Sequence, residues 1–495
     1  MRQKYLSLLM LMLLLVSCAS RRNVHSADIY PKREFRGAWI HTVHQKQYAA
    51  MTSEQTQAYL INIVDSLQLA GINAILWQIR PSADALYPSE LEPWSRYLTG
   101  TAGKAPDPMW DPLQFMIDEC HKRNIELHAW INPYRVTTVK TDELPENHIY
   151  YKHPEWFVRY GQQILFDPGL PECRDFITKV VRDIVTRYDV DAIHMDDYFY
   201  PYPVKDEEFP DEKSYAKYGN GMKLDDWRRH NVDLLIEQLH YDMRATKPWV
   251  RLGISPFCVW RNQKNDPRGS RTNAFENYSG LFSDVILWTE KGWVDYMLPQ
   301  LYLRLDHKTA SYDILARWWN ENTFGRHMYY GLSVNSAVKA PDLCEGTNQF
   351  TRMIEMSRYL DNVHGTCMWP AYPIVSNYNG AGDQLINVEH SRPAVIPAYD
   401  FIDAVAPAKV KSLKANEGKL TWKRVATKDP MQEQIYFVVY HFAKGEKVDI
   451  DAGNHIVTTT RSTEFALPAK AEGTYVVTAM DRCHNESEAV AVTIK

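Results

Sequence analysis

Short apolar runs alternate with amphipathic stretches along the chain from Glu34 to about Asp400. Apolar residues in the stretch Thr52–Ala70 recur at Tyr59, Ile63 and Leu67, which is helical spacing, and Ser53 is a suitable N-cap. Further helices are expected at Pro112–Arg123, Glu172–Tyr188, Asp225–Ala245, Ser311–Asn320 and Glu345–Leu360. The runs expected as strands are Arg36–Val43, Asn73–Arg80, Ile125–Asn132, Asp191–Asp196, Arg251–Pro256, Asp295–Tyr302, Met328–Val334 and Gly365–Pro370.

Eight strands separated by helices indicate parallel βαβ units, and residues 34–400 have the size of one large barrel. An open, doubly wound sheet is the alternative, but no strand is followed by a glycine-rich GxGxxG loop. The sequence therefore predicts an α/β fold, a (β/α)8 TIM barrel. Its long irregular segments follow strands, so they belong to the C-terminal face, where such barrels carry their active sites. These segments are Pro81–Asp111, Pro133–Pro171, Tyr198–Lys223 and Phe257–Asn277.

The pattern changes after Pro407, where helical spacing ends. Short runs of strand type follow at Lys409–Leu413, Lys419–Trp422, Ile435–His441, Thr463–Leu467 and Thr474–Met480. Residues 407–495 are therefore expected to form a small all-β sandwich.

The N-terminus has the pattern of a secretory signal. Arg2 and Lys4 precede the apolar run Leu6–Val16, which is too short to span a bilayer as a helix. The run ends in Leu15-Val16-Ser17-Cys18, which resembles a bacterial lipobox. That resemblance implies a signal peptide at residues 1–17, lipidation of Cys18 and a tether at residues 18–33. Ordinary secretion is the alternative. The residues directly after Cys18, Ala19–Asn23, include no Asp that would resemble an inner-membrane retention signal and no acidic run that would resemble a surface-export signal. An outer-membrane anchor facing the periplasm is therefore expected.

Composition narrows the function classes. The chain of 495 residues is 45% hydrophobic and 24% charged, as in ordinary globular proteins. Its net charge of −5 provides no basic field for nucleic acid. Fifteen Trp and thirty Tyr concentrate near loops that follow strands, which fits either sugar-stacking platforms or a large aromatic core. The six cysteines after Cys18 are dispersed without a CxxC pair, so a zinc site is not expected.

Asp196 and Asp197 close the fourth predicted strand, where side chains face the expected pocket. Glycoside hydrolysis requires two carboxyl groups around the scissile bond. We expect Asp196 to act as nucleophile or base and Asp197 to bind the sugar. The proton donor stays open, with Asp306 the first candidate and Asp84 and Asp197 the alternatives.

Other polar and aromatic residues at strand ends are expected to bind a polysaccharide. Arg80 and Arg135 could bind a substrate carboxylate or, alternatively, hold loops through salt bridges. A metal site built from His41, His128, His194 and Asp196 is a weaker alternative, because no HxH or HExxH motif follows a strand. No cofactor is expected. The expected substrate-binding residues are Trp39, His41, Arg80, Asp84, Trp130, Asn132, Arg135, His194, Tyr198, Trp260, Arg261, Gln300, Tyr302, Asn335 and Trp369.

Long motifs between residues 34 and 390 resemble the glycosyl hydrolase-like 10 family. They are Phe35–Ile40, Gln78–Ser89, His128–Arg135, Asp167–Gly169, Asp191–Pro201, Gly253–Asn262 and Asp295–Tyr302. The resemblance implies a barrel distantly similar to those of α-amylase and α-galactosidase, with a nucleophilic Asp ending strand four and a basic residue two positions earlier. His194 takes the place of that Arg or Lys. Strand five ends in Ser255-Pro256 and supplies no Glu as acid.

The same resemblance implies action on bacterial envelope glycans, above all peptidoglycan glycan strands stripped of peptides. A non-catalytic glycan-binding lipoprotein and a metal-dependent deacetylase or amidase are the rival functions.

The C-terminal segment resembles a fibronectin type III domain. The matching residues are Pro407, Val410, Leu420, Trp422, Tyr440, Tyr475, Val477, Ala479, Asp481 and Asn485–Ser487. This resemblance implies a spacer or interaction module.

Overall fold

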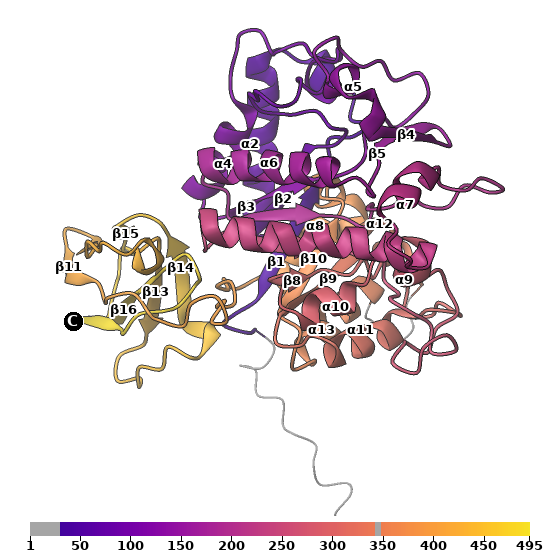
Figure 1. Cartoon of the computed structure of the whole chain (residues 1–495). Coiled ribbons are helices and arrows are strands. Elements are labelled where there is room, and N and C mark those ends of the chain that lie inside the picture. Colours follow the sequence, from indigo (N-terminus) through magenta and orange to yellow (C-terminus); the bar gives the residue numbers. More distant parts are fainter. Residues whose placement is uncertain (1–29, 342–347) are drawn as a thin grey trace, which may run out of the picture.

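The computed structural model describes residues 30–341 and 348–495. The predicted signal peptide (1–17), Cys18 and most of the tether lie outside the described residues. The described chain forms a closed barrel of eight parallel strands, followed by a small antiparallel β domain (Figure 1). The predicted fold class is therefore confirmed. Within the described ranges no helix combines the length and apolar character needed to cross a membrane.

The eight barrel strands coincide with the eight predicted runs. Their order around the barrel is β1-β10-β9-β8-β7-β6-β3-β2. They are β1 (Phe35–Ile40), β2 (Ala74–Arg80), β3 (Glu126–Ile131), β6 (Ala192–Met195), β7 (Arg251–Ile254), β8 (Tyr296–Met297), β9 (His327–Ser333) and β10 (Gly365–Trp369).

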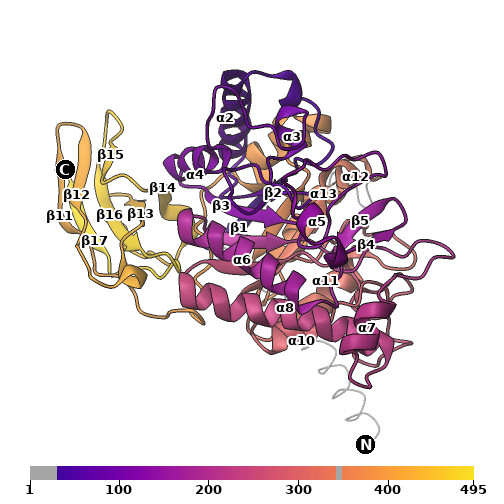
Figure 2. The same ribbon diagram turned by 45° about the horizontal axis from the view of Figure 1, so that its top comes forward.

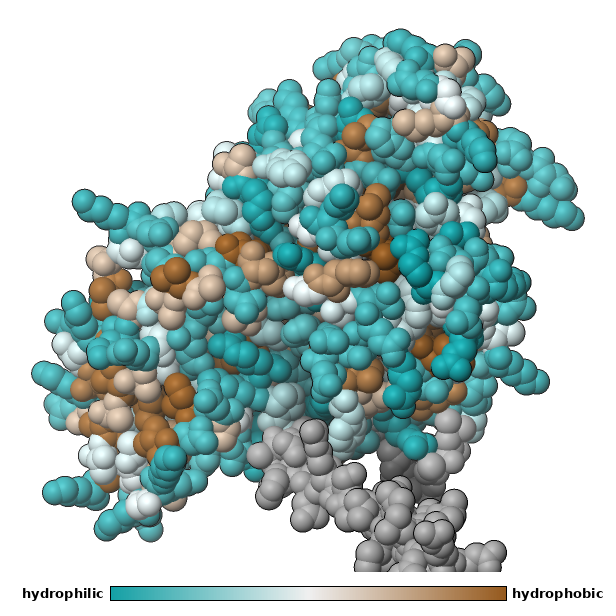
Figure 3. All heavy atoms as spheres, turned by 60° about the horizontal axis from the view of Figure 1, so that its bottom comes forward, coloured by the Kyte–Doolittle hydropathy of each residue, from teal (hydrophilic) through white to brown (hydrophobic). Residues whose placement is uncertain are grey.

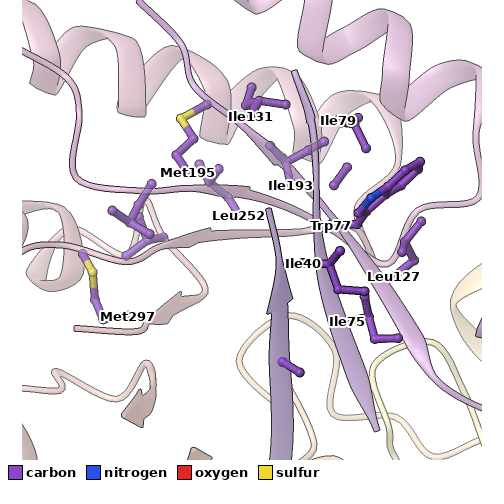
Figure 4. Packing of buried hydrophobic residues seen from close by; sticks show 14 of the residues in the cluster. Ile40, Ile75, Trp77, Ile79, Leu127, Ile131, Ile193, Met195, Leu252 and Met297 are labelled. Carbon is purple, nitrogen blue, oxygen red and sulfur yellow. The ribbon is translucent and has the colours of Figure 1, made fainter. Parts of the chain in front are cut away.

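Alternation along the strands divides the core into two layers. Ile40, Ile75, Trp77 and Leu127 point outward and pack under the helices (Figure 4). Residues of the opposite parity fill the barrel interior, where aromatic rings replace the usual branched aliphatics. This interior cluster consists of Phe35, Trp39, Ala74, Leu76, Trp130, Ala192, Tyr296, Leu298, Tyr329 and Cys367.

Helices surround the barrel on its outer side (Figure 1). The first begins at Ser53, the residue expected to be its cap. Thr52, in extended conformation, is the N-cap instead: its hydroxyl oxygen accepts from the backbone N–H of Gln55, and its backbone N–H donates to the Gln55 side-chain oxygen. The longer helices are α2 (Ser53–Leu69), α4 (Pro112–Lys122), α6 (Pro171–Arg187), α8 (Leu224–Thr246), α11 (Tyr312–Glu321) and α13 (Gln349–Arg358). Shorter helices are α3 (Arg96–Thr99), α5 (Ile149–Lys152), α7 (Glu212–Tyr218), α9 (Asn277–Gly280), α10 (Val285–Glu290), α12 (Val334–Lys339), α14 (Tyr372–Val375) and α15 (Ala381–Gln384).

The loop after β3 contains a hairpin that the hydrophobic pattern did not predict. Its strands are β4 (Phe157–Tyr160) and β5 (Gln163–Phe166). Arg135 pairs with Leu165, so the hairpin attaches directly to the segment that leaves the barrel. The strands are only four residues long, which is too short for a clear alternating pattern.

The C-terminal domain consists of two antiparallel sheets. Leu420 and Trp422 of one sheet share a core with Phe437, Val439 and Val477 of the other, as in a sandwich. One sheet has the order β11 (Lys411–Asn416), β12 (Lys419–Lys423), β15 (Glu464–Ala466), and the other β14 (Ile456–Thr460), β13 (Tyr436–Phe442), β16 (Gly473–Met480), β17 (Val490–Ile494). The sequence did not predict β14 and β17, whose exposed faces weaken the apolar signal.

The C-terminal domain lies against the N-terminal ends of the barrel strands (Figure 2). His484 contacts Glu126 at the start of β3, and Tyr436 donates to Asp191 just before β6. Asn124 and Thr459 add a hydrogen bond of 2.8 Å. Figure 3 shows a largely hydrophilic face with apolar residues gathered over the C-terminal domain. The C-terminal domain therefore covers the N-terminal end of the barrel.

Candidate active site

A cavity of about 150 Å³ opens at the C-terminal ends of the barrel strands. The sequence prediction named eight of its lining residues as candidates, and the ninth, Ser255, follows directly after β7. Parallel strands of a barrel converge at this face, so residues far apart in the chain meet here. The lining consists of Trp39, Trp130, Asp196, Asp197, Tyr198, Ser255, Gln300, Tyr302 and Trp369.

Asp196 is held by N–H donors that come mainly from β3 and its exit. Asn132 donates to its Oδ2 at 2.6 Å and the Trp130 indole donates to the same oxygen at 3.3 Å. The backbone N–H of Tyr198 donates to Oδ1 at 3.3 Å. These contacts fix the carboxyl orientation within the cavity.

Asn132 is itself oriented by a second layer of side chains. Gln78 donates to its Oδ1 at 2.8 Å, and Arg135 donates to the same oxygen at 2.9 Å. The side-chain oxygen Oε1 of Gln78 accepts from the backbone N–H groups of Thr42 and Val43. The amide of Asn132 can therefore present only its NH₂ group to Asp196.

Asp197 points to different partners. Tyr202 donates its hydroxyl hydrogen to Oδ2, and Gln300 donates to Oδ1 at 3.0 Å. Tyr202 was not among the predicted residues. Its place in an aromatic run four residues beyond Tyr198 was the only signal for it in the sequence.

Burial separates the two carboxyls from ordinary surface aspartates, and at Asp196 the neighbouring charge adds to its effect. Burial, followed by the charge of Asp197, raises the pKa of Asp196 to about 7, while Arg135 and Asn132 oppose this rise. Burial also raises the pKa of Asp197, and its bonds from Tyr202 and Gln300 oppose that rise. A carboxyl with a pKa of about 7 is partly protonated near neutral pH, so Asp196 can carry a proton there.

Aromatic rings form the walls of the cavity. Trp369 stands edge-on to Trp39 and Trp130, with centroid distances of 6.2 and 6.0 Å. Tyr302 stacks on Trp369 at 6.4 Å with an interplanar angle of 13°. Trp39 and Trp130 are buried and Trp369 is partly exposed. The same rings therefore belong to the barrel core and line the cavity.

His194 lies beneath the cavity and does not line it. The Trp39 indole N–H donates to its Nε2 at 3.2 Å, and Ser255 Oγ lies 3.0 Å from the same nitrogen. Burial, followed by the charge of His128, holds the pKa of His194 well below its usual range. This imidazole is therefore neutral and supports two residues of the lining.

Four other expected substrate-binding residues lie away from the cavity, in polar contacts of their own. Arg80 is fully buried and forms a two-bond ion pair with Glu92. Asp84 accepts from the backbone of Ser82, and burial raises its pKa to about 6. The remaining pair belongs to the loop after β7, where Trp260 donates to Asp284 and Arg261 pairs with Asp266.

The remaining candidates lie at the margin or on the surface. His41 lies 5.0 Å from Trp369, ring centroid to ring centroid, and so borders the wall. Asn335 is exposed on α12. Asp306 is exposed, pairs with Arg304 at 3.1 Å and does not line the cavity. Across residues 30–341 and 348–495, no group of three or more His, Cys, Asp or Glu side chains is arranged to hold a metal ion.

Comparison with known proteins places this barrel in a family. Residues 34–345 match the model of the family described as "Glycosyl hydrolase-like 10". The chain is 41% identical to "Glycosyl hydrolase YngK" of Bacillus subtilis (strain 168) over 95% of each chain. It is 36% identical to "Glycosyl hydrolase DigH" of Escherichia coli (strain K12), over 68% of this chain and 82% of that one.

Among solved structures, the glycoside hydrolase domain of PgaB (BpsB) from Bordetella bronchiseptica is 12% identical, with a TM-score of 0.48 over 71% of this chain and 98% of that one. The family match and the two relatives agree with the carboxyl pair and aromatic cavity at the C-terminal end of the barrel. The chain belongs to the glycosyl hydrolase-like 10 family and is a glycoside hydrolase.

Proposed function

We propose that this protein hydrolyses the glycan strands of bacterial peptidoglycan after their peptides have been removed. The observation that carries the proposal is the buried pair Asp196 and Asp197 in an aromatic cavity. A resemblance of the barrel motifs to a family expected to act on envelope glycans supports the substrate class. Flat aromatic walls suit the apolar faces of sugar rings.

Asp196 is the general acid and then the base of the proposed reaction. The sequence suggested a nucleophile or base, but a carboxyl with a pKa of about 7 is partly protonated at neutral pH. It can give its proton to the leaving glycosidic oxygen and then take a proton from the attacking water.

Asp197 is the ionised partner in this scheme. Its two oxygens accept from Tyr202 and Gln300, which favours the carboxylate form. A carboxylate here stabilises the positive charge that develops at the anomeric carbon. The sequence made Asp306 the first candidate for the carboxyl that works with Asp196, but Asp306 is not part of the cavity lining. Asp197 takes the place of that second carboxyl.

Arg135 gives the site a preference for acidic sugars. Its guanidinium lies over the Tyr198 ring at 5.5 Å and beside the cavity. Removing peptides from a peptidoglycan strand leaves a free carboxylate on alternate sugars. A cation at the rim can pair with that carboxylate, whereas a peptide-bearing strand lacks it.

The proposal extends to location and to the C-terminal domain. The sequence before residue 30 supports lipidation of Cys18 and an anchor in the outer membrane facing the periplasm. The arrangement of three strands against four supports a fibronectin type III-like domain. Incorporation of a labelled fatty acid into the wild-type protein, and its loss in Cys18→Ala, tests the anchor.

The experiment for the function compares cleavage with binding. Purified peptide-free strands are incubated with wild type, Asp196→Asn and Asp197→Asn, and the products are read by mass spectrometry. We expect shorter fragments with new reducing ends from wild type alone and binding by all three proteins. Binding by all three without cleavage would support a glycan-binding lipoprotein instead. Strands of unchanged length that have lost acetyl groups would support a deacetylase.

A further inference from the structure

An unbroken series of buried hydrogen bonds crosses the barrel interior from the cavity floor to the C-terminal domain. The Trp39 indole donates to His194 Nε2 at 3.2 Å, and His194 Nδ1 lies 3.0 Å from the hydroxyl of Tyr296. That hydroxyl lies 2.9 Å from His128 Nδ1, and His128 Nε2 lies 3.0 Å from Glu126 Oε2. All five side chains are at most 2% exposed.

The Trp39 end of this series fixes the direction in which each hydrogen bond is donated. An indole nitrogen can only donate, so His194 Nε2 must be the acceptor. A neutral imidazole then carries its hydrogen on Nδ1 and donates it to Tyr296. Tyr296 has one hydrogen, which it gives to His128 Nδ1. His128 is thereby left with its hydrogen on Nε2, facing Glu126.

The Glu126 end of the series agrees with this direction. Arg251 forms an ion pair with Glu126 Oε1, and His484 of the C-terminal domain lies 2.7 Å from the same oxygen. Burial alone would raise the pKa of Glu126, but Arg251 and then His484 outweigh it and hold the value well below its usual range. Glu126 is therefore a carboxylate, which can only accept, and it selects the Nε2–H form of His128.

We propose that Glu126, held in place by His484 of the C-terminal domain, is a positioning residue for the active site: it fixes the tautomer of His194 and so the orientation of Trp39 and Ser255. The inference rests on the proposed role of the cavity, because Trp39 and Ser255 belong to its lining. The C-terminal domain thus completes the catalytic barrel as well as covering its base.

The substitution Glu126→Gln tests the proposal with almost no change in shape. Arg251 and His484 both face Oε1, so the carbonyl of the new amide remains there and its NH₂ group faces His128 Nε2. The three bonds between residue 126 and His194 must then reverse, and His194 would carry its hydrogen on Nε2, against the Trp39 N–H. Two donors facing each other force Trp39 or His194 to turn.

The primary measurement is the tautomer of His194 in ¹⁵N-histidine-labelled protein, read from long-range ¹H–¹⁵N correlations. The His194 signals are assigned by their absence from His194→Gln. We expect Nδ1–H in wild type and Nε2–H in Glu126→Gln. A folded Glu126→Gln protein that keeps Nδ1–H would overturn the proposal. Because this readout uses no substrate, it stands apart from any failure of the glycan assay.

The kinetic measurement uses the strands that the wild type cleaves. We expect Glu126→Gln to lower kcat on the order of tenfold, the scale at which outer partners of an oriented histidine act, with a smaller change in KM. Thr459→Val is the matched control at the same domain interface, because it removes the hydrogen bond to Asn124 and none of the hydrogen bonds in the series. Equal kcat values in wild type and Glu126→Gln would overturn the positioning role.

A second pair of variants covers the case in which Glu126→Gln does not fold. Tyr296→Phe interrupts the series, whereas Tyr329→Phe removes an equally buried hydroxyl that bonds His327 and Tyr399 instead. We expect only Tyr296→Phe to lower kcat. An equal loss of kcat in the two variants would show that the effect comes from general disruption of core packing, and it would overturn the proposal.

Discussion

The two ends of the barrel contain the same chemical groups under opposite electrostatic conditions. At the C-terminal end, buried Asp196 has a raised pKa. At the N-terminal end, Glu34, Glu126 and Asp191 are equally buried and have lowered pKa values. Burial alone would raise all four. The difference comes from the groups beside each carboxylate. At the N-terminal end, an arginine or a histidine contacts each carboxylate. At the C-terminal end, N–H dipoles and a second carboxylate surround Asp196.

This contrast separates stability from chemistry within one domain. At the N-terminal end of the barrel, carboxylates in ion pairs with arginines join the strands to each other and to the C-terminal domain. At the other end, the raised pKa of Asp196 would leave it partly protonated near neutral pH, as the proposed general acid catalysis requires. Removing a charge should therefore have opposite consequences at the two ends.

The largest effect is expected for Asp196→Asn. The amide cannot exchange a proton, so hydrolysis of peptide-free strands should fall by about 10²–10⁴-fold. The melting temperature should stay level or rise, because an unpaired buried charge is removed. Initial rates and thermal unfolding of the same preparation give both numbers. A variant with near-wild-type activity would remove Asp196 from the mechanism.

Asp191→Asn should show the reverse pattern. Asp191 accepts from His121 at 2.8 Å and from the backbone of Leu127 at 2.8 Å. Breaking a buried ion pair on one side should lower the free energy of unfolding by ~3–5 kcal/mol. Urea unfolding measures it, and kcat at a temperature where the variant is folded should remain close to wild type. Loss of activity without loss of stability would contradict the division between the two ends.

Low pH should first destabilise the N-terminal end of the barrel. Arg36 and Arg358 lower the pKa of Glu34 from 4.5 to about 2 despite its burial. A depressed folded-state pKa gives stability that is present above the unfolded value and lost as pH falls toward the folded value. Glu34 should therefore contribute about 3 kcal/mol above pH 4.5 and lose it between pH 4.5 and 2. Glu34→Gln should flatten the pH dependence of unfolding across that window, and an unchanged slope would exclude Glu34 as its source.

Activity should decline as pH rises through about 7, because Asp196 must begin the reaction protonated. Arg135 opposes the rise of this pKa, so Arg135→Met should move the alkaline limb of kcat/KM to higher pH by a fraction of a unit to one unit. Profiles of wild type and variant on a neutral oligosaccharide would isolate this effect from carboxylate binding. A shift to lower pH would contradict the proton-donor assignment.

The smallest effect is expected from a chelator. None of the described residues form a cluster suited to a metal ion, and the proposed chemistry uses carboxyls alone. Activity after dialysis against EDTA should equal that of the untreated protein. A loss restored by a divalent cation would favour the metal-dependent alternative.

The hydrophobic pattern of the sequence was sufficient to predict the barrel and most of its cavity. Strand periodicity placed Trp39, Trp130 and Trp369 at strand ends, and a closed parallel barrel brings all such ends to one face. The pair Asp196 and Asp197 was visible for the same reason. These predictions succeed because they depend on local alternation and on a topology that permits few arrangements.

Other features of the site depend on loop conformations and long-range contacts, which no local sequence pattern predicts. Loop conformation decides that Tyr202 reaches Asp197 while Asp306 faces Arg304. It also decides that Arg80 pairs with Glu92 inside the protein. The contact between His484 and Glu126 joins residues 358 positions apart, across two domains. The residue types of the two barrel ends are set by the sequence, but the sign of each pKa shift is set by which charges the tertiary structure brings within a few ångströms.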